Sequence, residues 1–453
     1  MNVLCNKGVI GKLTLCLILT LGMSAGFNIG DVAVNPNHEK SGAVAEPIVP
    51  IFSFGLVRSA LAQGSGPEVS PSVGAVLKQA SDHLGSQKFG PAAAVLRAGL
   101  GASGLTEFEV FSIHRLLIGA ELSNQQFAQV IESGRLVLSS PFLKDSEKPY
   151  IRQSLITANF KLSKFADAAQ LAEAGLKSNP QDLSLLEVRL KSLYLAKKYV
   201  EAAGAVEDYL KASSGNKPSE DILKIYAHSA SESDAEKQYV SALMQLVQYY
   251  PSSDYWSDLL YRKNASGVFQ KLGEIQFYRL LQATQSFKDP GEFIDAAELA
   301  IKAGFPVEAG HYLDTGVQLG LLPNKELQAV YNDKRKQIAG LIQQDVAALE
   351  AKAVSKVTSK ATAPKNAKSK PISALIAEGY NLVLQGQKDS GLEALQTALA
   401  QAQGKPEVTS ARLAYALGFY KAGKSEDAIR EFKLLKSDAP DIANLWLAVF
   451  NVK

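Results

Sequence analysis

The sequence contains almost no cysteine, and the little it has lies near the start. Cys5 and Cys16 are the only two cysteines among 453 residues. Lys7 and Lys12 precede the apolar run LTLCLILTLGM at 13–23, an arrangement typical of a secretory signal peptide. Removing such a leader leaves no cysteine. Disulfides, thiolate metal ligands and thiol nucleophiles are then excluded from the remaining chain.

The end of this leader has two candidate positions. One is cleavage after Ala25, and the other is cleavage after Ala62, which follows a second apolar stretch at 48–57. We therefore predict a leader over 1–62 and a linker over 63–72. The expected location is the periplasm or the exterior of the cell, with retention at the envelope as a variant. The alternative is that the first apolar run is a buried helix.

The sequence also lacks a long apolar run and an excess of one charge. No apolar run reaches the ~18–20 residues of a membrane-spanning helix. The net charge is +3 and charged residues make up 21% of the chain, so no overall electrostatic field favours nucleic acid. Alternation typical of strands is absent as well. The expected class is a soluble all-α protein.

Motifs for catalysis, metals and cofactors are missing. GLGASG at 99–104 matches G-x-G-x-x-G, but a helical segment precedes it where dinucleotide binding requires a strand, so a glycine-rich turn is expected. There is no phosphate-binding loop of the G-x-x-x-x-G-K-[ST] type and no G-x-S-x-G elbow. The five histidines are isolated: His38, His83, His114, His228 and His311. We predict no catalytic residue, no metal ligand and no cofactor.

Helical periodicity dominates from about Pro71 onward. Apolar residues recur at i, i+3, i+4 and i+7, which predicts amphipathic helices of roughly 12–16 residues. An aromatic residue precedes a small-residue segment four times, at intervals of 34 or 38 residues: Phe89, Phe127, Phe165 and Tyr199. Each unit is predicted to be a helix hairpin. The aromatic residue opens the second helix, and Ala168 or Ala202 three positions later lets the helices approach closely.

The clearest unit spans 411–440. Six positions carry its pattern: Ala416, Phe419, Gly423, Ala428, Phe432 and Pro440. In type and spacing they resemble the tetratricopeptide repeat. The segment 150–180 is similar through Phe165, Ala168 and Pro180, although Ser163 stands where the repeat has glycine. The resemblance implies a solenoid of helix hairpins that buries one face of each unit against the next.

The stretch AELAIKAGFPVEAGHYLDTG at 297–316 fits the same register. Gly304 takes the turn position, and Ala309 takes the small packing position on the second helix. His311 is then a surface residue or a hydrogen-bonded core histidine. The wider segment 276–322 resembles tetratricopeptide-containing proteins of the bacterial envelope, whose specific role is undefined.

One segment interrupts the repeats. The predicted order is a repeat solenoid over 73–322, a long helix over 323–354, a flexible linker over 355–371 and a repeat pair over 372–453. From Lys352 to Lys370 there are six lysines and no acid. Two interpretations stay open for this stretch. It is either a solvated hinge or a site of peripheral attraction to an anionic membrane surface.

The resemblance also implies a binding surface. In tetratricopeptide proteins the first helix of each hairpin lines a concave groove. By position, the partner-binding candidates are Phe160, Lys161, Lys191, Tyr194, Tyr380, Tyr420 and Lys421. Gln153 and Thr157 replace the lysine–asparagine clamp of chaperone-binding members. The tyrosines and tryptophan within 249–261 are either core or a contact surface.

These inferences predict an exported, non-catalytic scaffold that binds an unidentified protein or peptide along the groove. The alternative is a structural component of an envelope assembly, a secretion complex or the cell-wall machinery. An enzyme is the remote alternative, because none of the motifs that would support one is present.

Overall fold

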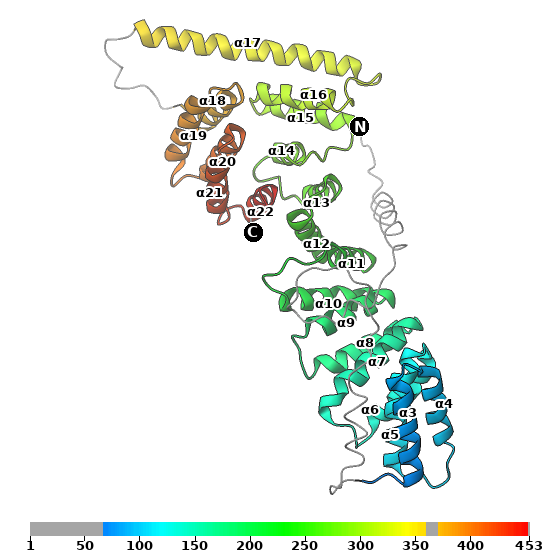
Figure 1. The fold of residues 1–453 in the computed structure, drawn as a ribbon. Helices are drawn as coiled ribbons and strands as arrows, with labels where there is room; N and C mark the ends of the chain where they lie inside the picture. Colours follow the sequence, from blue (N-terminus) through cyan, green and yellow to red (C-terminus); the bar gives the residue numbers. More distant parts are fainter. Residues whose placement is uncertain (1–66, 359–369, 452–453) are drawn as a thin grey trace. The chain divides into compact units, whose positions relative to one another are not determined.

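The computed structural model describes residues 67–358 and 370–451 (Figure 1). Over these residues the secondary structure consists of twenty α-helices and one short 3₁₀ helix, with no strand. The prediction of an all-α fold of helix hairpins is confirmed. The predicted leader at 1–62 and most of the linker at 355–371 lie outside the described residues, so both stay predictions.

The chain divides into two compact units, 1–239 and 240–453, and the division falls within helix α12 (Glu236–Tyr249). We call them unit 1 and unit 2 and describe each by itself. Within the described ranges, none of the helices combines the length and the apolar character needed to cross a membrane.

Unit 1 is a series of hairpins in which each helix packs against the next one in the sequence (Figure 1). Its helices are α3 (Pro71–Gly85), α4 (Phe89–Gly99), α5 (Glu107–Ser123), α6 (Phe127–Ser139), η2 (Asp145–Glu147), α7 (Lys148–Lys161), α8 (Phe165–Leu176), α9 (Leu183–Leu195), α10 (Tyr199–Ala212) and α11 (Glu220–Glu232). The four repeated aromatic residues are each the first residue of a second helix. Ala168 and Ala202 are fully buried. Most contacts are therefore between consecutive helices, and the rest join the first helices of neighbouring hairpins.

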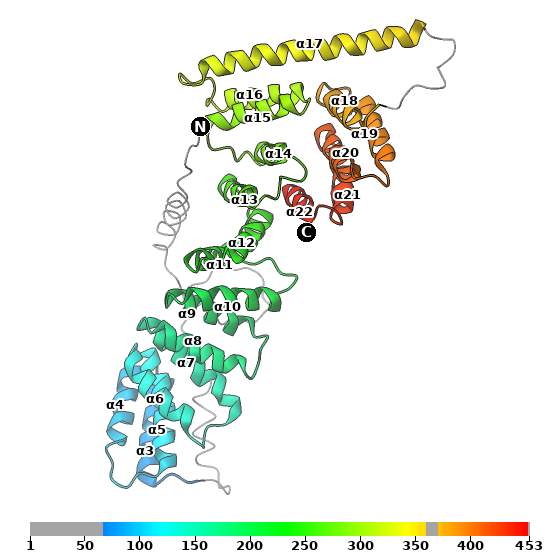
Figure 2. The ribbon, with the colours of Figure 1, turned by 180° about the vertical axis from the view of Figure 1, so that it is seen from behind.

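Unit 2 contains hairpins before and after one long helix (Figure 2). Its helices are α13 (Ser253–Ala265), α14 (Ile275–Ala283), α15 (Pro290–Lys302), α16 (Pro306–Gln318), α17 (Gln328–Thr358), α18 (Ile372–Leu384), α19 (Lys388–Ala402), α20 (Val408–Ala422), α21 (Ser425–Leu435) and α22 (Pro440–Val449). The small residues Ala309 and Ala428 are fully buried, as is Phe432. Pro440 is the first residue of α22, where proline forfeits no intrahelical hydrogen bond.

The division differs from the one expected from the sequence, which separates the last repeats at 355–371. The helices after this segment belong to unit 2 because they pack on the hairpin α15–α16. The Asn381 amide donates to the carbonyl of Gly304 at 2.9 Å, across 77 residues of sequence. The long helix also begins later and ends later than the predicted 323–354.

The turn inside each hairpin has one recurring geometry. The second residue after the first helix, or the first in the case of Gly423, has a positive φ. The next backbone N–H bonds to the carbonyl five residues earlier, as in Lys198 to Leu193 at 2.9 Å. This is the Schellman arrangement, which satisfies carbonyls that the helix end leaves free. In unit 1 the positive-φ residues are Gln87, Gln125, Ser163, Lys197 and Asp234; in unit 2 they are Gly304, Gly386 and Gly423.

One hairpin packs its backbones more closely than an alanine would allow. A Cβ added to Gly391 would lie 2.6 Å from the carbonyl oxygen of Gly379, and one added to Gly379 would lie 2.8 Å from that of Gly391. Real Cβ atoms do not approach backbone so closely. Gly391 therefore stands where the repeat usually has alanine because α18 and α19 are in backbone contact.

Candidate functional site

The predicted groove residues of unit 1 lie on the first helices α7 and α9. Lys161 is exposed at the end of α7, and Phe160 beside it is half-buried. The Phe160 ring packs edge-on against Phe165, with centroids 5.5 Å apart. This pair closes the α7–α8 turn and leaves part of the Phe160 ring at the surface.

The corresponding end of α9 carries a three-ring cluster. Tyr194 lies 6.1 Å from Tyr199 and 5.5 Å from His228 between ring centroids, and Tyr199 lies 5.6 Å from His228. One turn earlier, Lys191 pairs with Glu187. The cluster joins α9, α10 and α11, and Tyr194 and Lys191 keep part of their surface accessible.

His228 is the least satisfied member of this cluster. In the described part of the chain its buried Nδ1 atom has no hydrogen-bond partner. Burial lowers the pKa of His228, while the nearby Glu232 carboxylate acts in the opposite direction. The ring is therefore an uncharged packing surface near neutral pH.

Unit 1 also contains a buried polar network that the sequence analysis missed. Glu121 accepts hydrogen bonds from Arg97 Nε at 2.9 Å and from Ser133 Oγ at 3.0 Å, and Ser133 also lies 3.2 Å from His114 Nδ1. Burial lowers the pKa of His114, and the Arg97 charge adds to this effect. The Ser133 hydroxyl is fully buried and donates to the carboxylate, so it lacks the access to substrate that a nucleophile needs.

In unit 2 the structure corrects one predicted partner contact. Tyr380 is only 1% exposed and belongs to the packing between α18 and α16. Its hydroxyl donates to Glu308 Oε1 at 3.1 Å. The prediction placed Tyr380 on an open groove, but that side of α18 is covered by α15–α16. Tyr380 has no surface to offer a partner.

Glu308 is the centre of a buried ion pair. Arg279 donates to it twice, from Nε to Oε1 at 2.9 Å and from Nη2 to Oε2 at 2.7 Å. The guanidinium also lies over the rings of Phe305 and Tyr380, 4.8 and 4.6 Å from their centroids. Burial alone would lower the pKa of Arg279, but the Glu308 charge raises it above its ordinary value. Burial, together with Glu308, raises the pKa of Tyr380.

This ion pair could be found only in part from the sequence. Arg279 interrupts the apolar face of α14, and Glu308 precedes the packing residue Ala309. A charge on a buried face predicts that a partner is needed. Nothing in the sequence spacing identifies Glu308, 29 residues away, as that partner.

The other two groove residues of unit 2 are half-buried. Tyr420 packs on Trp446 and Phe450, with centroids 5.1 and 5.7 Å away. Lys421 Nζ donates to Gln282 Oε1 at 3.4 Å. Burial lowers the pKa of Lys421, and it is also the main cause of the lowered pKa of His311. These side chains face other helices of unit 2.

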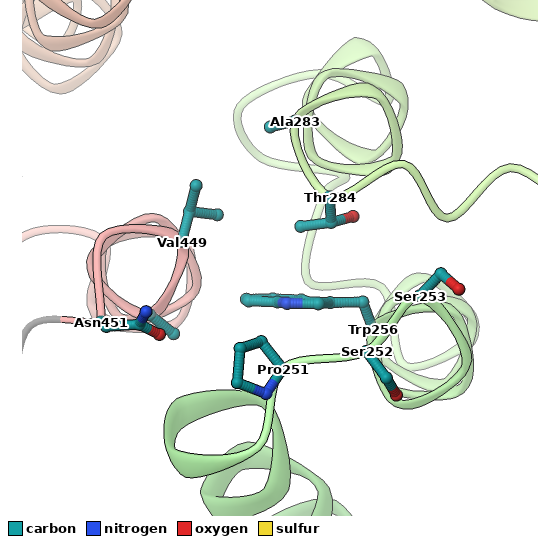
Figure 3. A pocket seen from close by; sticks show the side chains of 9 residues that line it. Pro251, Ser252, Ser253, Trp256, Ala283, Thr284, Val449 and Asn451 are labelled. Carbon is teal, nitrogen blue, oxygen red and sulfur yellow. The ribbon is translucent and has the colours of Figure 1, made fainter.

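The aromatic residues at 249–261 are buried or half-buried. Tyr255 and Trp256 are buried, and Tyr261 packs edge-on against Phe277 at 5.3 Å. Trp256 nevertheless borders a pocket of about 230 Å³ between α13, α14 and α22. Figure 3 shows its indole extending between Pro251 and Thr284 toward Val449.

The remaining motifs have structural roles. Gly99 is the last residue of helix α4, and Gly101 and Gly104 follow the helix. A Cβ on Gly99 would lie 2.7 Å from Val76 Cγ1, so this glycine allows α3 and α4 to approach. Among the described residues no group of three or more His, Cys, Asp or Glu side chains is placed to hold a metal ion.

Comparison with known proteins supports the repeat assignment. The tetratricopeptide repeat family matches residues 155–217, which run from α7 into the segment after α10, and residues 376–442, which run from α18 to the start of α22. No curated protein matches the chain in sequence.

Among solved structures, a chain in the structure of Naa15/Naa10 bound to HypK-THB is similar, with a TM-score of 0.27 and 13% identity. That alignment covers 82% of this chain and 58% of the other, so this chain spans little more than half of that protein's length. The TPR domain of P58(IPK) is also similar, with a TM-score of 0.19 and 10% identity over 83% of this chain and 96% of that one. The repeat matches and the hairpin geometry together establish the chain as a tetratricopeptide-repeat-like protein.

Proposed function

We propose that this chain is an exported, non-catalytic scaffold that binds a segment of a protein partner along helices α7 and α9 of unit 1. Tetratricopeptide repeats form scaffolds for protein interaction, and the matched segment 155–217 includes the second half of α7 and all of α9. The partner segment is a helix or an extended stretch lying across consecutive first helices.

The observation that carries this proposal is the two-sided character of these helices. One side is core, with Ile156 on α7 and Leu190 on α9 buried. The other side keeps Thr157, Lys161 and Tyr194 at least partly accessible. A half-buried tyrosine supplies rigid contact area to a partner, and the lysines supply orientation.

Site-specific photocrosslinking tests the location of this surface. A photoreactive residue at Thr157 is expected to give one discrete adduct in the producing cell. The matched control is Gln170, an exposed residue of the second helix α8 in the same hairpin. Equal adducts at both positions, or none at Thr157, would contradict a partner on the first helices. Sequencing the N-terminus of the mature protein separately tests export and distinguishes Ala25 from Ala62.

A second candidate is a structural role in an envelope assembly, and helix α17 is the observation that favours it. Of its side chains over 328–347, only Ile338 is buried, and Val330 and Val346 are exposed. Deleting 328–358 is then expected to release the protein from a large complex in size-exclusion chromatography. An unchanged elution volume would reject the assembly role.

Attraction of the lysine-rich stretch 352–370 to a membrane is a proposal of its own. Flotation with vesicles containing anionic lipid is expected at low salt and not at 0.5 M salt, since screening removes contacts between exposed charges. Binding that does not depend on salt concentration, or no binding, would reject the membrane attraction.

A further inference from the structure

The turns α7–α8 and α9–α10 share an unusual concentration of lysine. Lys161 and Lys164 flank the first turn, and Lys197 and Lys198 form the second. We call these four residues the lysine turns. All four side chains are exposed. Because successive hairpins stack, equivalent turns lie at the same edge of unit 1, about 10 Å apart.

Three of the acids nearby are engaged elsewhere, whereas Glu201 in the first turn of α10 is exposed. Asp167 on α8 pairs with Arg135, and Glu173 pairs with Arg189, which also holds Asp208. Within the described ranges no ion pair and no side-chain hydrogen bond involves any residue of the lysine turns. Four exposed lysines without an ion-pair partner therefore face solvent at one edge, with Glu201 as the exposed acid closest in sequence.

The backbone at Lys197 adds a conformational argument. Its φ is +57°, in the left-handed region, where a side chain is strained relative to glycine. Glycine fills the same turn position at 304, 386 and 423 in unit 2. Other side chains occupy this position at 87, 125, 163 and 234 of unit 1, so the turn geometry itself does not require lysine.

Aromatic rings lie beside these charges. Phe160 and Phe165 sit at the first turn, and Tyr194 and Tyr199 at the second; all four are half-buried. The edge thus combines apolar ring surface with surrounding ammonium groups. A ligand that fits it carries several negative charges close to an apolar or aromatic side chain.

The next turn sets a limit to this surface. Between α11 and α12 the exposed residues include Glu232, Asp234 and Glu236, so the charge reverses within one repeat. A membrane or a nucleic acid presents negative charge over a much longer distance and would meet this acidic turn. A short acidic stretch of a protein avoids it.

We infer that the lysine turns bind a short acidic segment of a partner protein, with aspartate or glutamate side chains on both sides of an apolar residue. This inference rests on the proposed function and specifies the chemistry of the partner. Recognition is by internal side-chain carboxylates, so a segment with an amidated C-terminus binds equally well.

The test uses the full mature chain and a labelled, amidated twelve-residue peptide with eight glutamates and two central phenylalanines. Its control is the same peptide with glutamine in place of glutamate. The variant Lys197→Glu/Lys198→Glu is compared with Lys177→Glu/Lys211→Glu. The second pair makes the same change in net charge on exposed lysines at the opposite ends of α8 and α10.

The expected result is binding of the glutamate peptide alone, weakened at least tenfold by Lys197→Glu/Lys198→Glu and less than twofold by the control pair. Binding is also expected to weaken as salt rises from 50 to 300 mM. Equal loss in both variants, or equal binding of the glutamine peptide, overturns the inference, as does preference for anionic vesicles over the peptide. Crosslinking at Thr157 that survives Lys197→Glu/Lys198→Glu would leave the scaffold function standing and reject only the acidic partner.

Discussion

The two units build the same turn from different residues. Every hairpin turn of unit 1 places a side chain at the left-handed position, from Gln87 to Asp234, whereas those of unit 2 at 304, 386 and 423 use glycine. The hydrogen bonds are the same in both, at 2.8–2.9 Å to the fifth carbonyl back. The motif therefore depends on the backbone conformation and not on glycine itself. The hairpin turns of unit 1 accept this strain and these three turns of unit 2 avoid it, although Gln285 after α14 also has a positive φ.

A second difference lies in how each unit buries charge. In unit 2 the side chains of Arg279 and Glu308 are 5% and 1% exposed. In unit 1 the Glu121 side chain is equally buried, but Arg97 is 33% exposed. The unit 2 pair is closed off from water, and the unit 1 pair is partly hydrated. Removing the glutamate of the pair should therefore reduce the free energy of unfolding more in unit 2 than in unit 1.

The largest expected effect follows from this contrast. Glu308→Ala leaves Arg279 charged and buried, and should reduce the unfolding free energy of unit 2 by about 3–5 kcal/mol. Glu121→Ala should cost less, because Arg97 can stay hydrated. Hydrogen exchange measured separately over α14–α18 and α3–α6 checks both. An equal loss in the two units would break the comparison, and Glu393→Ala, at an exposed position, serves as the control.

Close backbone packing gives the next effect. Gly391→Ala should lower the stability of unit 2 by about 1–3 kcal/mol, because the new methyl group meets the carbonyl of Gly379. Gly204→Ala on α10 is the matched change, since a Cβ there meets nothing within 4 Å. It should raise the stability of unit 1 by about 0.5–1 kcal/mol. Denaturant unfolding measures both, and a neutral Gly391→Ala would contradict the backbone contact.

The turns themselves give a smaller effect of opposite sign in the two units. Gly423→Ala should destabilise unit 2 by about 1 kcal/mol, entirely through the backbone, because no atom crowds the added Cβ. Gln125→Gly should stabilise unit 1 by about 0.5 kcal/mol, since relief of strain exceeds the entropy that glycine adds to the unfolded chain. Thermal melts of both variants test the pair. Two changes of the same sign would show that the units do not differ in turn strain.

The smallest expected effect is a difference in sensitivity to acid. Burial lowers the pKa of His114 and His228 in unit 1 and of His311 in unit 2. A histidine with a lowered folded pKa contributes stability above its unfolded pKa of about 6.5, and that stability is lost as pH falls. Unit 1, with two such residues, should lose more stability than unit 2 between pH 7 and 5. His114→Gln should reduce the pH dependence of unit 1; an unaltered dependence would reject the assignment.

The sequence predicts this fold well where local pattern decides it. The aromatic residues from Phe89 to Tyr199 mark helix starts because each occurs once per repeat, at the same position of the hairpin. The pattern from Ala416 to Pro440 gives both helices of a hairpin because each position has a local steric role. Ser163 shows the limit of predicting turns from the residue pattern. It stands where the repeat has glycine, yet the α7–α8 turn has the same backbone geometry as the others.

What the sequence could not predict depends on distant partners. Tyr380 looks like a groove residue by its place in the repeat, and it becomes buried only because α15–α16 cover it. Gly391 looks like a departure from the pattern until the carbonyl of Gly379 is found against it. The lysine turns and the acidic turn between α11 and α12 form one edge only because stacking of the hairpins makes these turns neighbours. Each of these facts arises from packing between segments and leaves no mark in local spacing.

The contact between Tyr380 and Glu308 has a consequence for the order in which the protein assembles. Its two residues are 72 positions apart, whereas unit 1 is built from contacts between consecutive helices. On the ribosome, each hairpin of unit 1 can form as it emerges, but the arginine–glutamate pair stays without its tyrosine until the chain has grown well past α17. Unit 2 should therefore be the slower unit to mature and the one that leaves a charged, incomplete core exposed in the meantime.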